Sequence, residues 1–376
     1  MNDDTCILVT GSKGFIGKNL ISHLNELTGI TITEFVRGDD SAKLPGMVAK
    51  ADAIIHLAGE NRPVDESAFA KVNLGLTALL CDAITQEFAA TGRQVTFVLA
   101  SSTQAEQDNH YGRSKLNAEK ELQALANTTG NPCIIFRLPG VFGKWCKPNY
   151  NSVVATFCYN FANDIPIQIN DPKTSIKLVY IDDVVNALLA ALDSPSPACI
   201  HATLVPEYNI TLGELAAQIG AFGNCRNALI VERVGIGFAR ALYATYLSYL
   251  PSELFSYEVE RHEDKRGTFV EMIKTQDSGQ FSYFMAHPGV TRGGHYHNTK
   301  TEKFLVIKGD ALIRLRHILT GELVELFTSG DKPRIVDTIP GWSHDITNVG
   351  DCEMYVICWA NENFDRQNPD TFTSEV

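Results

Sequence analysis

Short apolar runs alternate with helix-like segments over the first 220 residues of the chain. The runs have the length of buried strands, and the segments between them carry apolar residues at helical spacing. The runs are residues 6–10, 53–57, 95–100 and 133–138, and the helical segments are residues 15–27, 68–88 and 114–126. Buried strands that alternate with helices form a parallel sheet covered on both faces. The pattern therefore predicts an α/β fold built on a doubly wound parallel sheet.

After about residue 245 the helical spacing fades, and short β-rich runs separated by turn residues take its place. These runs are residues 267–273, 281–286, 303–307, 311–317 and 352–359. Many short strands with turns between them are typical of an all-β barrel or double-sheet domain. We expect the boundary within 240–255, without a low-complexity linker, and hence two domains at 1–245 and 246–376.

Composition narrows the classes of partner. The chain has 376 residues, with 32 lysines and arginines against 44 aspartates and glutamates, which gives a net charge of −12. At about 150 residues per domain, this length fits two or three domains. Non-specific binding to nucleic acid or to an anionic membrane needs clustered positive charge, so both kinds of partner are disfavoured. A basic pocket for a small phosphate ligand remains compatible with the composition.

The chain also lacks the sequence signals of export. No apolar stretch reaches the roughly 18–20 residues that span a bilayer, and residues 1–4 contain two acids where a signal peptide carries positive charge. We expect a cytoplasmic protein without membrane insertion. The nine cysteines are scattered, without a Cys-x-x-Cys pair, so neither a disulfide framework nor a thiolate zinc site is indicated.

A glycine-rich segment follows the first predicted strand and opens the first predicted helix. Gly11 suits a tight turn, Gly14 lets a pyrophosphate approach the backbone, and Gly17 permits close helix packing. The helix N-terminus favours the phosphate charge. We therefore expect a Rossmann-like dinucleotide site that includes Gly11, Ser12, Lys13, Gly14, Phe15, Ile16 and Gly17.

The second predicted strand, residues 30–36, ends at Arg37. An acid that grips the adenosine ribose is expected there for NAD, whereas an arginine can form charge-assisted bonds to a 2′-phosphate. Arg37 thus favours NADPH as the cofactor. The alternative is a solvated surface arginine, since Asp39 and Asp40 lie close by in the sequence.

Tyr111 and Lys115 are four residues apart and share one face of a helix. An ammonium beside a phenol favours the phenolate and brings proton transfer nearer to neutral pH. Upstream, residues 101–103 end an apolar strand with three hydroxyl side chains. We expect Ser102 to hydrogen-bond a substrate oxygen there, with Thr103 as the alternative hydroxyl.

Residues 5–220 resemble the extended short-chain dehydrogenases/reductases that modify nucleotide sugars. The matches are the glycine triplet, His56-Leu57-Ala58-Gly59, Ser102, Tyr111, Lys115, and residues 137–143 and 180–184. The resemblance implies that Tyr111 is the proton donor, that Lys115 holds the nicotinamide ribose and lowers the Tyr111 pKa, and that Ser102 orients the sugar oxygen. It also implies that the cofactor site includes Leu57, Ala58 and Gly59.

One departure from that family limits the reaction type. Family members that dehydrate sugars carry an acidic pair after the active-site hydroxyl, whereas Thr103-Gln104-Ala105 stands here. Dehydration is therefore disfavoured. Epimerases of the family recycle bound NAD, which fits Arg37 poorly, so net carbonyl reduction by NADPH is the expected reaction.

Four potential metal ligands gather in the β-rich region. His295 and His297 alternate along a predicted strand and so point to the same face, while Glu302 lies beyond a bend and His344 in a later segment. Three imidazoles and a carboxylate suit zinc, nickel, manganese or iron. A structural metal that only pins the barrel is the alternative to a catalytic one.

Residues 255–376 resemble the cupin family, whose fold is a double-stranded β-helix barrel. The first cupin motif matches at Gly289, His295, His297, Glu302 and Gly309. The second matches at Gly341, His344 and Asn348, although Pro340 adjoins the glycine where the usual pattern has one residue between. The resemblance implies a divalent metal, with zinc expected, held by His295, His297, Glu302 and His344.

Residues 264–271 and 291–296 are also similar to the cupin-like dTDP-4-keto-6-deoxysugar epimerases, which use a histidine base beside a 4-keto sugar. A proton α to a carbonyl can be removed where a base lies near it and a metal or arginine stabilises the enolate. The second domain is therefore an epimerase candidate.

The order of the two domains, together with residues 143–152, closely resembles the CapF family of capsular polysaccharide and O-antigen biosynthesis enzymes. That family is implied to be a homodimer that acts on a UDP-2-acetamido-2,6-dideoxy-4-keto-hexose. The cupin would epimerise C3, and the reductase would use NADPH to give UDP-2-acetamido-2,6-dideoxy-L-talose, a precursor of UDP-N-acetyl-L-fucosamine. Besides Ser102, the candidate substrate residues are Arg62, Lys144 and Asn149.

Two other functions remain open on the sequence. The first is a single-activity 4-keto nucleotide-sugar reductase whose cupin binds metal for stability or dimerisation. The second is an NADPH-sensing module without activity, which the intact Tyr111 and Lys115 disfavour because a sensor needs no proton donor.

Overall fold

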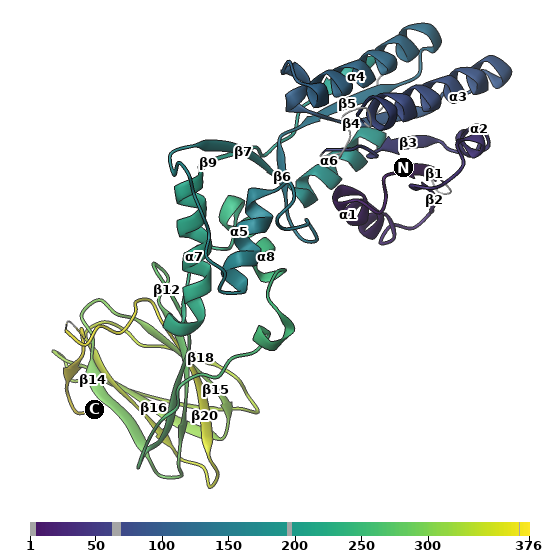
Figure 1. Ribbon diagram of the computed structural model, residues 1–376. Helices are drawn as coiled ribbons and strands as arrows, with labels where there is room; N and C mark the ends of the chain where they lie inside the picture. Colours follow the sequence, from purple (N-terminus) through teal and green to yellow (C-terminus); the bar gives the residue numbers. More distant parts are fainter. Residues whose placement is uncertain (1–4, 62–68, 194–197, 368) are drawn as a thin grey trace. The chain divides into compact units, whose positions relative to one another are not determined.

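The computed structural model describes residues 5–61, 69–193, 198–367 and 369–376. The chain forms two compact units (Figure 1). Residues 1–219 and 241–250 make up the first unit, and residues 220–240 and 251–376 the second. The predicted division fell at residue 245; in the structure, residues 220–240 group with the later part of the chain.

The first unit is built on a parallel sheet with strand order β2-β1-β3-β4-β5-β8. Every neighbouring pair in this order is parallel. The strands are β1 (Thr5–Thr10), β2 (Ile30–Phe35), β3 (Ala53–His56), β4 (Thr96–Ser102), β5 (Cys133–Leu138) and β8 (Cys199–Ala202). The strand order reverses between β1 and β3, and in open α/β sheets ligands bind outside the carboxyl ends of the strands at such a point. The predicted doubly wound sheet is confirmed.

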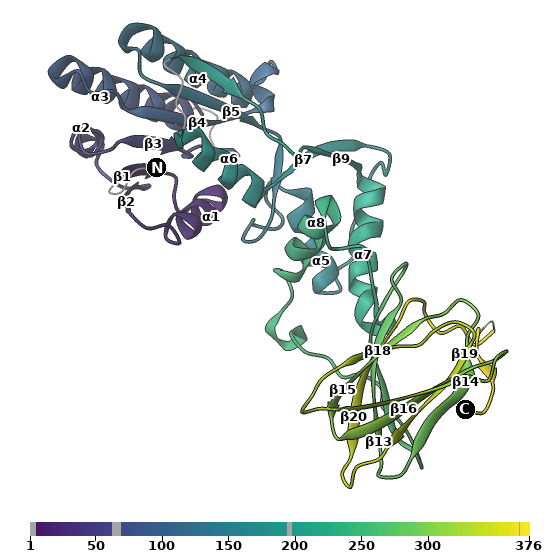
Figure 2. The same ribbon diagram turned by 180° about the vertical axis from the view of Figure 1, so that it is seen from behind.

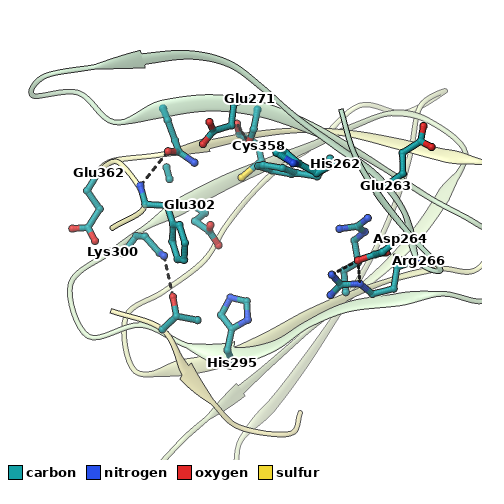
Figure 3. A pocket seen from close by; sticks show the side chains of 17 residues that line it. His262, Glu263, Asp264, Arg266, Glu271, His295, Lys300, Glu302, Cys358 and Glu362 are labelled. Carbon is teal, nitrogen blue, oxygen red and sulfur yellow. Dashed lines mark hydrogen bonds and ion pairs between the residues drawn. The ribbon is translucent and has the colours of Figure 1, made fainter. Parts of the chain in front are cut away.

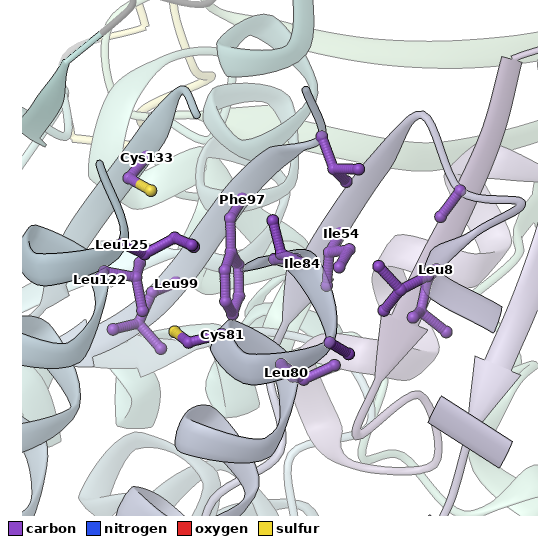
Figure 4. Close-up of a cluster of buried hydrophobic side chains, with 14 of the residues drawn as sticks. Leu8, Ile54, Leu80, Cys81, Ile84, Phe97, Leu99, Leu122, Leu125 and Cys133 are labelled. Carbon is purple, nitrogen blue, oxygen red and sulfur yellow. The ribbon is translucent and has the colours of Figure 1, made fainter. Parts of the chain in front are cut away.

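Helices cover both faces of this sheet, with α3 and α4 on one face and α1 and α6 on the other (Figures 1 and 2). Their bounds are α1 (Phe15–Leu24), α2 (Leu44–Val48), α3 (Leu76–Thr91), α4 (His110–Thr129) and α6 (Ile181–Asp193). A buried cluster between the sheet and α3 and α4 holds these layers together, with Phe97 at its centre (Figure 4). Leu8 and Ile54 come from the sheet, and Leu80 and Leu122 from the helices.

The helix that carries Tyr111 and Lys115 has well-defined ends. Asn109 precedes α4, and its side-chain oxygen accepts a hydrogen bond from the Gly112 N–H at 2.7 Å. Gly130 follows α4 in the left-handed conformation, at φ 72°. Asparagine and glycine are favoured at these two positions because the first satisfies a free N–H group and the second has no Cβ to clash.

A second, smaller sheet in the first unit has the order β6-β7-β9. Further helices follow or precede its strands along the chain. The bounds are β6 (Gly140–Phe142), α5 (Val153–Ala162), β7 (Ser175–Tyr180), β9 (Tyr208–Thr211), α7 (Leu212–Ala228), β10 (Ile230–Val231) and α8 (Gly237–Leu247). Thr211 and Glu214 cap α7 reciprocally: the Thr211 N–H donates to the Glu214 carboxylate at 3.0 Å, and the Glu214 N–H to the Thr211 hydroxyl at 3.2 Å.

The second unit contains two sheets, with strand orders β10-β12-β13-β20-β15-β18 and β17-β16-β19-β14-β21; β11 pairs with β12. One buried cluster draws side chains from both sheets, among them Phe284 and Phe304 from the first and Ile313 and Ile346 from the second. The bounds are β11 (His262–Asp264), β12 (Gly267–Thr275), β13 (Gln280–Ala286), β14 (Thr291–Tyr296), β15 (Glu302–Lys308), β16 (Asp310–His317), β17 (Leu323–Ser329), β18 (Ile335–Asp337), β19 (Trp342–Asn348), β20 (Met354–Ala360) and β21 (Phe372–Thr373). This confirms the predicted all-β fold.

Within the described ranges, no helix has both the length and the apolar character needed to cross a membrane. All nine cysteines are free thiols.

Candidate active sites and metal centre

The glycine-rich segment lies at the end of β1, next to the segment that follows β3. Gly11 has φ +73°, and a Cβ there would lie 2.5 Å from the Ala58 nitrogen. The Leu57 N–H donates to the Thr10 carbonyl at 3.1 Å, and the Ala58 N–H to the Thr10 hydroxyl at 3.3 Å. A side chain at Gly11 would therefore separate the two segments of the predicted cofactor site that the structure brings together.

The start of α1 offers groups suited to a dinucleotide phosphate. Gly14 immediately precedes the helix, which begins with Phe15 and Ile16. A Cβ at Gly17 would lie 2.2 Å from the Gly11 carbonyl oxygen, so only glycine fits there. Ser12 is 2% exposed. A helix N-terminus beside a buried hydroxyl fits a bound pyrophosphate.

Both basic side chains near the end of β2 are paired with carboxylates. Lys13 Nζ lies 2.7 Å from Glu34, and Arg37 Nη2 lies 2.6 Å from Glu60. The Arg37 side chain is 84% exposed, so its guanidinium is open to a ligand from solvent. A 2′-phosphate at this position would share Arg37 with Glu60.

Ser102, Tyr111 and Lys115 lie together at the end of β4 and the start of α4. The Ser102 hydroxyl is hydrogen-bonded to Tyr111, whereas Thr103 is exposed. Lys115 is buried, and its ammonium donates to the Ala100 carbonyl at 3.0 Å. A Cβ on Gly59 would lie 3.2 Å from that nitrogen, which brings Lys115 next to the predicted cofactor segment.

Burial changes the acidity of both groups. It raises the pKa of Tyr111, an effect that the hydrogen bond with Ser102 opposes. It lowers the pKa of Lys115 from 10.5 to about 8, an effect that the charge of Glu119 opposes. The direction for Tyr111 is opposite to the lowering that the family resemblance implied, because in this structure burial is the largest influence on the phenol.

The sequence did not single out Asn73 or Glu119, although both support this cluster. Asn73 accepts the Glu60 N–H at 2.7 Å and donates to the Ser114 hydroxyl at 3.0 Å. Glu119 is 4% exposed; it accepts a hydrogen bond from Ser101 and pairs with Arg137 at 2.6 Å. The only sequence signal for Glu119 is its place four residues after Lys115 on the same helix face.

The other substrate candidates are less closely gathered. Arg62 lies outside the described residues. Lys144 Nζ pairs with Asp182 at 2.7 Å and lies over the Trp145 ring, 5.5 Å from its centre. The exposed Asn149 donates its backbone N–H to Thr156 at 2.9 Å. Trp145 also lines a cavity of about 600 Å³ at the glycine-rich segment, with Ser12, Lys13, Lys18 and Ile21.

His295, His297, Glu302 and His344 form one cluster, in which one ligand atom from each side chain lies within 4.8 Å of the others. The residues come from the end of β14, the loop after it, the start of β15 and β19, and His295 is paired directly with His344 across β14 and β19. Glu302 Oε2 lies 3.4 Å from Nε2 of both His297 and His344.

The chemistry of this cluster fits a divalent metal. His344 Nε2 is buried and has no hydrogen-bond partner of good geometry. Burial lowers the pKa of His295 to about 4, with the neighbouring histidines adding to the effect. Burial alone would raise the Glu302 pKa, but its interactions with His297 and His344 hold it well below its usual range. A neutral imidazole and an ionised carboxylate are the forms that bind metals.

The cluster opens into a pocket of about 530 Å³, lined by His295 and Glu302 (Figure 3). Lys300 lies near Glu302 on one side, while Asp264 and Arg266 form an ion pair of 2.6 Å at the other end (Figure 3). Arg292 also lines the pocket; burial lowers its pKa, and its Nε has no hydrogen-bond partner. The pocket thus places the candidate metal cluster beside three cationic side chains, within a lining that also contains five carboxylates.

Known protein families match both parts of the chain. Residues 7–201 match the NAD dependent epimerase/dehydratase family, and residues 262–372 match the polysaccharide biosynthesis C-terminal domain. A UDP-2-acetamido-2,6-beta-L-arabino-hexul-4-ose reductase of Pseudomonas aeruginosa is 54% identical over 98% of both chains.

Solved structures of the same architecture cover the whole chain. The capsular polysaccharide assembling protein CapF from Staphylococcus aureus is 42% identical, with a TM-score of 0.88 over 98% of this chain and 100% of its own. A structure of CapF with the inhibitor 3-isopropenyl-tropolone is 38% identical, with a TM-score of 0.83 over 99% of this chain and 100% of its own. Both sets of comparisons confirm the resemblance inferred from the sequence, and the chain belongs to the CapF family of polysaccharide biosynthesis proteins.

Proposed function

We propose that the protein is a bifunctional nucleotide-sugar enzyme, with an NADPH-dependent 4-keto reductase in the first unit and a metal-dependent C3 epimerase in the second. Its substrate is a UDP-2-acetamido-2,6-dideoxy-4-keto-hexose, in keeping with the name of the 54% identical relative. The observation that carries the proposal is the cluster of Ser102, Tyr111 and Lys115 beside Gly59. The metal-type cluster in the second pocket extends it to two activities.

In the reduction, Tyr111 donates its phenolic proton to the C4 oxygen of the sugar. Ser102 orients that oxygen from its position against Tyr111, and Lys115 holds the nicotinamide ribose beside Gly59. Bound at the glycine-rich segment, NADPH would supply the hydride for C4. The ketone thereby becomes an alcohol, with one new C–H bond from the hydride and one new O–H bond from Tyr111.

Binding of the phosphorylated cofactor is assigned to the segment from Gly11 to Gly17 and to Arg37. Support comes from the start of α1, the buried Ser12 beside it and the exposed Arg37 guanidinium. A guanidinium forms strong charge-assisted bonds with a phosphate.

In the epimerisation, a basic side chain of the pocket would take the C3 proton from one face of the sugar, and a protonated group would return a solvent-derived proton to the other. That proton is acidic because C3 lies next to the C4 ketone. A divalent metal held by His295, His297, Glu302 and His344 would polarise the ketone oxygen, with zinc as the proposed ion. The cationic side chains Arg266, Arg292 and Lys300 in the same pocket favour the negative charge of the enolate and of the UDP group.

The two reactions have a required order. Epimerisation needs the C4 ketone, which the reduction removes, so C3 inversion comes first and reduction fixes its result. The product is UDP-2-acetamido-2,6-dideoxy-L-talose. We also propose a homodimer, as the family resemblance implies, and light scattering of the purified protein would test it.

The decisive experiment is mass-resolved product analysis in deuterated water with the UDP-4-keto sugar and NADPH. We expect one solvent deuterium at C3 and an alcohol at C4. Tyr111→Phe should retain the deuterium exchange but lose the reduction, and His295→Ala should lose exchange while it still reduces a pre-epimerised ketone.

Other outcomes identify the alternatives. If His295→Ala retains C3 exchange, the proposed metal site is not needed for epimerisation and the two-site mechanism fails. If the wild-type protein reduces C4 without deuterium at C3, the protein is a single-activity reductase. If the wild-type protein consumes no NADPH with this substrate, the reductase proposal fails.

A further inference from the structure

We propose that Asp370, near the C-terminus, is a positioning residue for the metal cluster: it holds the His297 ring and the turn that joins His297 to Glu302. The inference rests on the proposed metal site. It assigns a role to a segment that lies outside the motifs carrying the four ligands.

The backbone carbonyl of Asp370 fixes the orientation of His297. This oxygen lies 2.6 Å from His297 Nδ1. A carbonyl oxygen only accepts hydrogen bonds, so Nδ1 must carry a proton, and in the neutral ring Nε2 then keeps its lone pair. Nε2 is the atom that faces Glu302, at 3.4 Å. The contact therefore selects the tautomer in which His297 can bind a metal through the nitrogen that points into the cluster.

The side chain of Asp370 holds the turn after His297. Its carboxylate accepts the backbone N–H groups of Asn298 at 3.1 Å, Thr299 at 2.9 Å and Lys300 at 2.9 Å. The Thr299 hydroxyl adds a fourth hydrogen bond, at 3.0 Å. Three consecutive N–H groups converge on one carboxylate, so the backbone between His297 and Glu302 is wrapped around Asp370. These two ligands can keep their spacing only while that turn keeps its shape.

The residues on either side of Asp370 anchor it in place. The buried Lys300 ammonium donates to the Thr371 hydroxyl at 3.1 Å and to the Pro369 carbonyl at 3.4 Å. Strand β21 then pairs with β14, with Thr373 opposite His295. Asp370 itself has φ +37°, a backbone conformation that is costly for a residue with a Cβ and persists only where its surroundings enforce it.

The test measures metal binding directly, without the reaction. The protein is stripped of metal, and its affinity for zinc is measured by competition with a chromogenic chelator. Asp370→Ala keeps the backbone carbonyl but frees the turn between His297 and Glu302, and it is expected to weaken zinc binding about 10–100-fold, the usual cost of disturbing the groups that orient metal ligands. Asp370→Asn keeps one acceptor oxygen and should fall between this variant and the wild type.

Asp365→Ala is the matched control, because Asp365 lies in the same segment and its carboxylate accepts a backbone N–H, that of Gln367 at 2.8 Å. It should bind zinc like the wild type. If Asp370→Ala and Asp370→Asn both bind zinc as tightly as Asp365→Ala, the positioning role is wrong while the metal site stands. If His295→Ala has the same zinc affinity as the wild-type protein, the proposed four-residue metal site itself is wrong. Far-UV circular dichroism of each metal-free variant checks that it is folded; should Asp370→Ala be unfolded, Asp370→Asn alone decides.

Discussion

The buried ion pair between Glu119 and Arg137 lies beneath the end of β4, and its removal should destabilise the first unit strongly. Arg137 donates to the Glu119 carboxylate through Nε at 3.0 Å and through Nη2 at 2.6 Å. The Glu119 side chain is only 5% exposed, against 27% for Arg137. Arg137→Met would leave a buried carboxylate with the Ser101 hydroxyl as its remaining partner.

The expected cost follows from this asymmetry. Removal of one partner of a buried pair costs about 3–5 kcal/mol. Because Ser101 still donates to Glu119, we expect the lower end, about 3 kcal/mol, which corresponds to a fall in melting temperature of about 6–12 °C for a unit of this size. Glu119→Leu should cost less, about 1–2 kcal/mol, because Arg137 keeps its second carboxylate, Glu106, at 2.7 Å.

The double variant Glu119→Leu/Arg137→Met provides the critical comparison. An apolar pair can replace a buried ion pair at little cost, so the double variant should be within about 1 kcal/mol of the wild type. The assay is urea unfolding of the full-length protein at pH 7, followed by circular dichroism at 222 nm, which reports on the helices. Arg113→Met serves as the control, because the Arg113–Asp108 pair is exposed and should contribute less than about 1 kcal/mol.

Two results would refute this reasoning. One is an Arg137→Met variant that unfolds at the same urea concentration as Arg113→Met. The other is a double variant no more stable than Arg137→Met alone, which would mean that Arg137 acts through packing and not through the buried charge of Glu119.

Three further predictions concern the first unit. Gly17→Ala should abolish binding of the nicotinamide cofactor, measured by calorimetry, because the new Cβ would lie 2.2 Å from the Gly11 carbonyl oxygen; unchanged affinity would contradict the packing argument. Arg37→Ala should weaken NADPH binding about tenfold or more while leaving NADH binding nearly unchanged, since a charge-assisted hydrogen bond contributes about 1.5–3 kcal/mol; an equal loss for both cofactors would argue against a 2′-phosphate contact. Burial lowers the pKa of Lys115 to about 8, so between about pH 8 and 10.5 the unfolded chain binds more protons than the folded one, and stability should rise with pH. Lys115→Met should remove this pH dependence, of up to about 1.4 kcal/mol per pH unit, from the free energy of unfolding measured in urea. If stability depends on pH identically in the two proteins, folding does not lower the Lys115 pKa.

The elements that the sequence predicted correctly are those encoded by local pattern. The apolar run at residues 95–100 became β4, and the helical segment at 114–126 lies inside α4, because both bury their apolar residues against the same sheet. The two histidines of β14 and its following loop could be paired with Glu302 and His344 only through the cupin resemblance. The structure then brought the four side chains together.

The partners that the sequence did not reveal are all distant in the chain. Glu119 meets Arg137 across 18 residues, and Asp370 meets the turn after His297 across 70 to 72 residues. No periodicity links such residues, because their contact depends on how strands and helices pack. The grouping of residues 220–240 with the later part of the chain was missed for the same reason: their spacing resembles that of the helices before them.

Residues 220–240 belong to the second unit and residues 241–250 to the first, which affects both the synthesis of the protein and its separation into fragments. Residues 241–250 complete the first unit, although the chain has by then already contributed residues 220–240 to the second. During synthesis, the first unit therefore stays incomplete until about 30 residues beyond the midpoint of α7 have left the ribosome, even if its parallel sheet has already formed. No single cut yields two intact units, since cleavage after residue 219 removes 241–250 from the first unit and cleavage after residue 250 leaves 220–240 attached to it. Separate expression of the two units would need a split that duplicates this stretch.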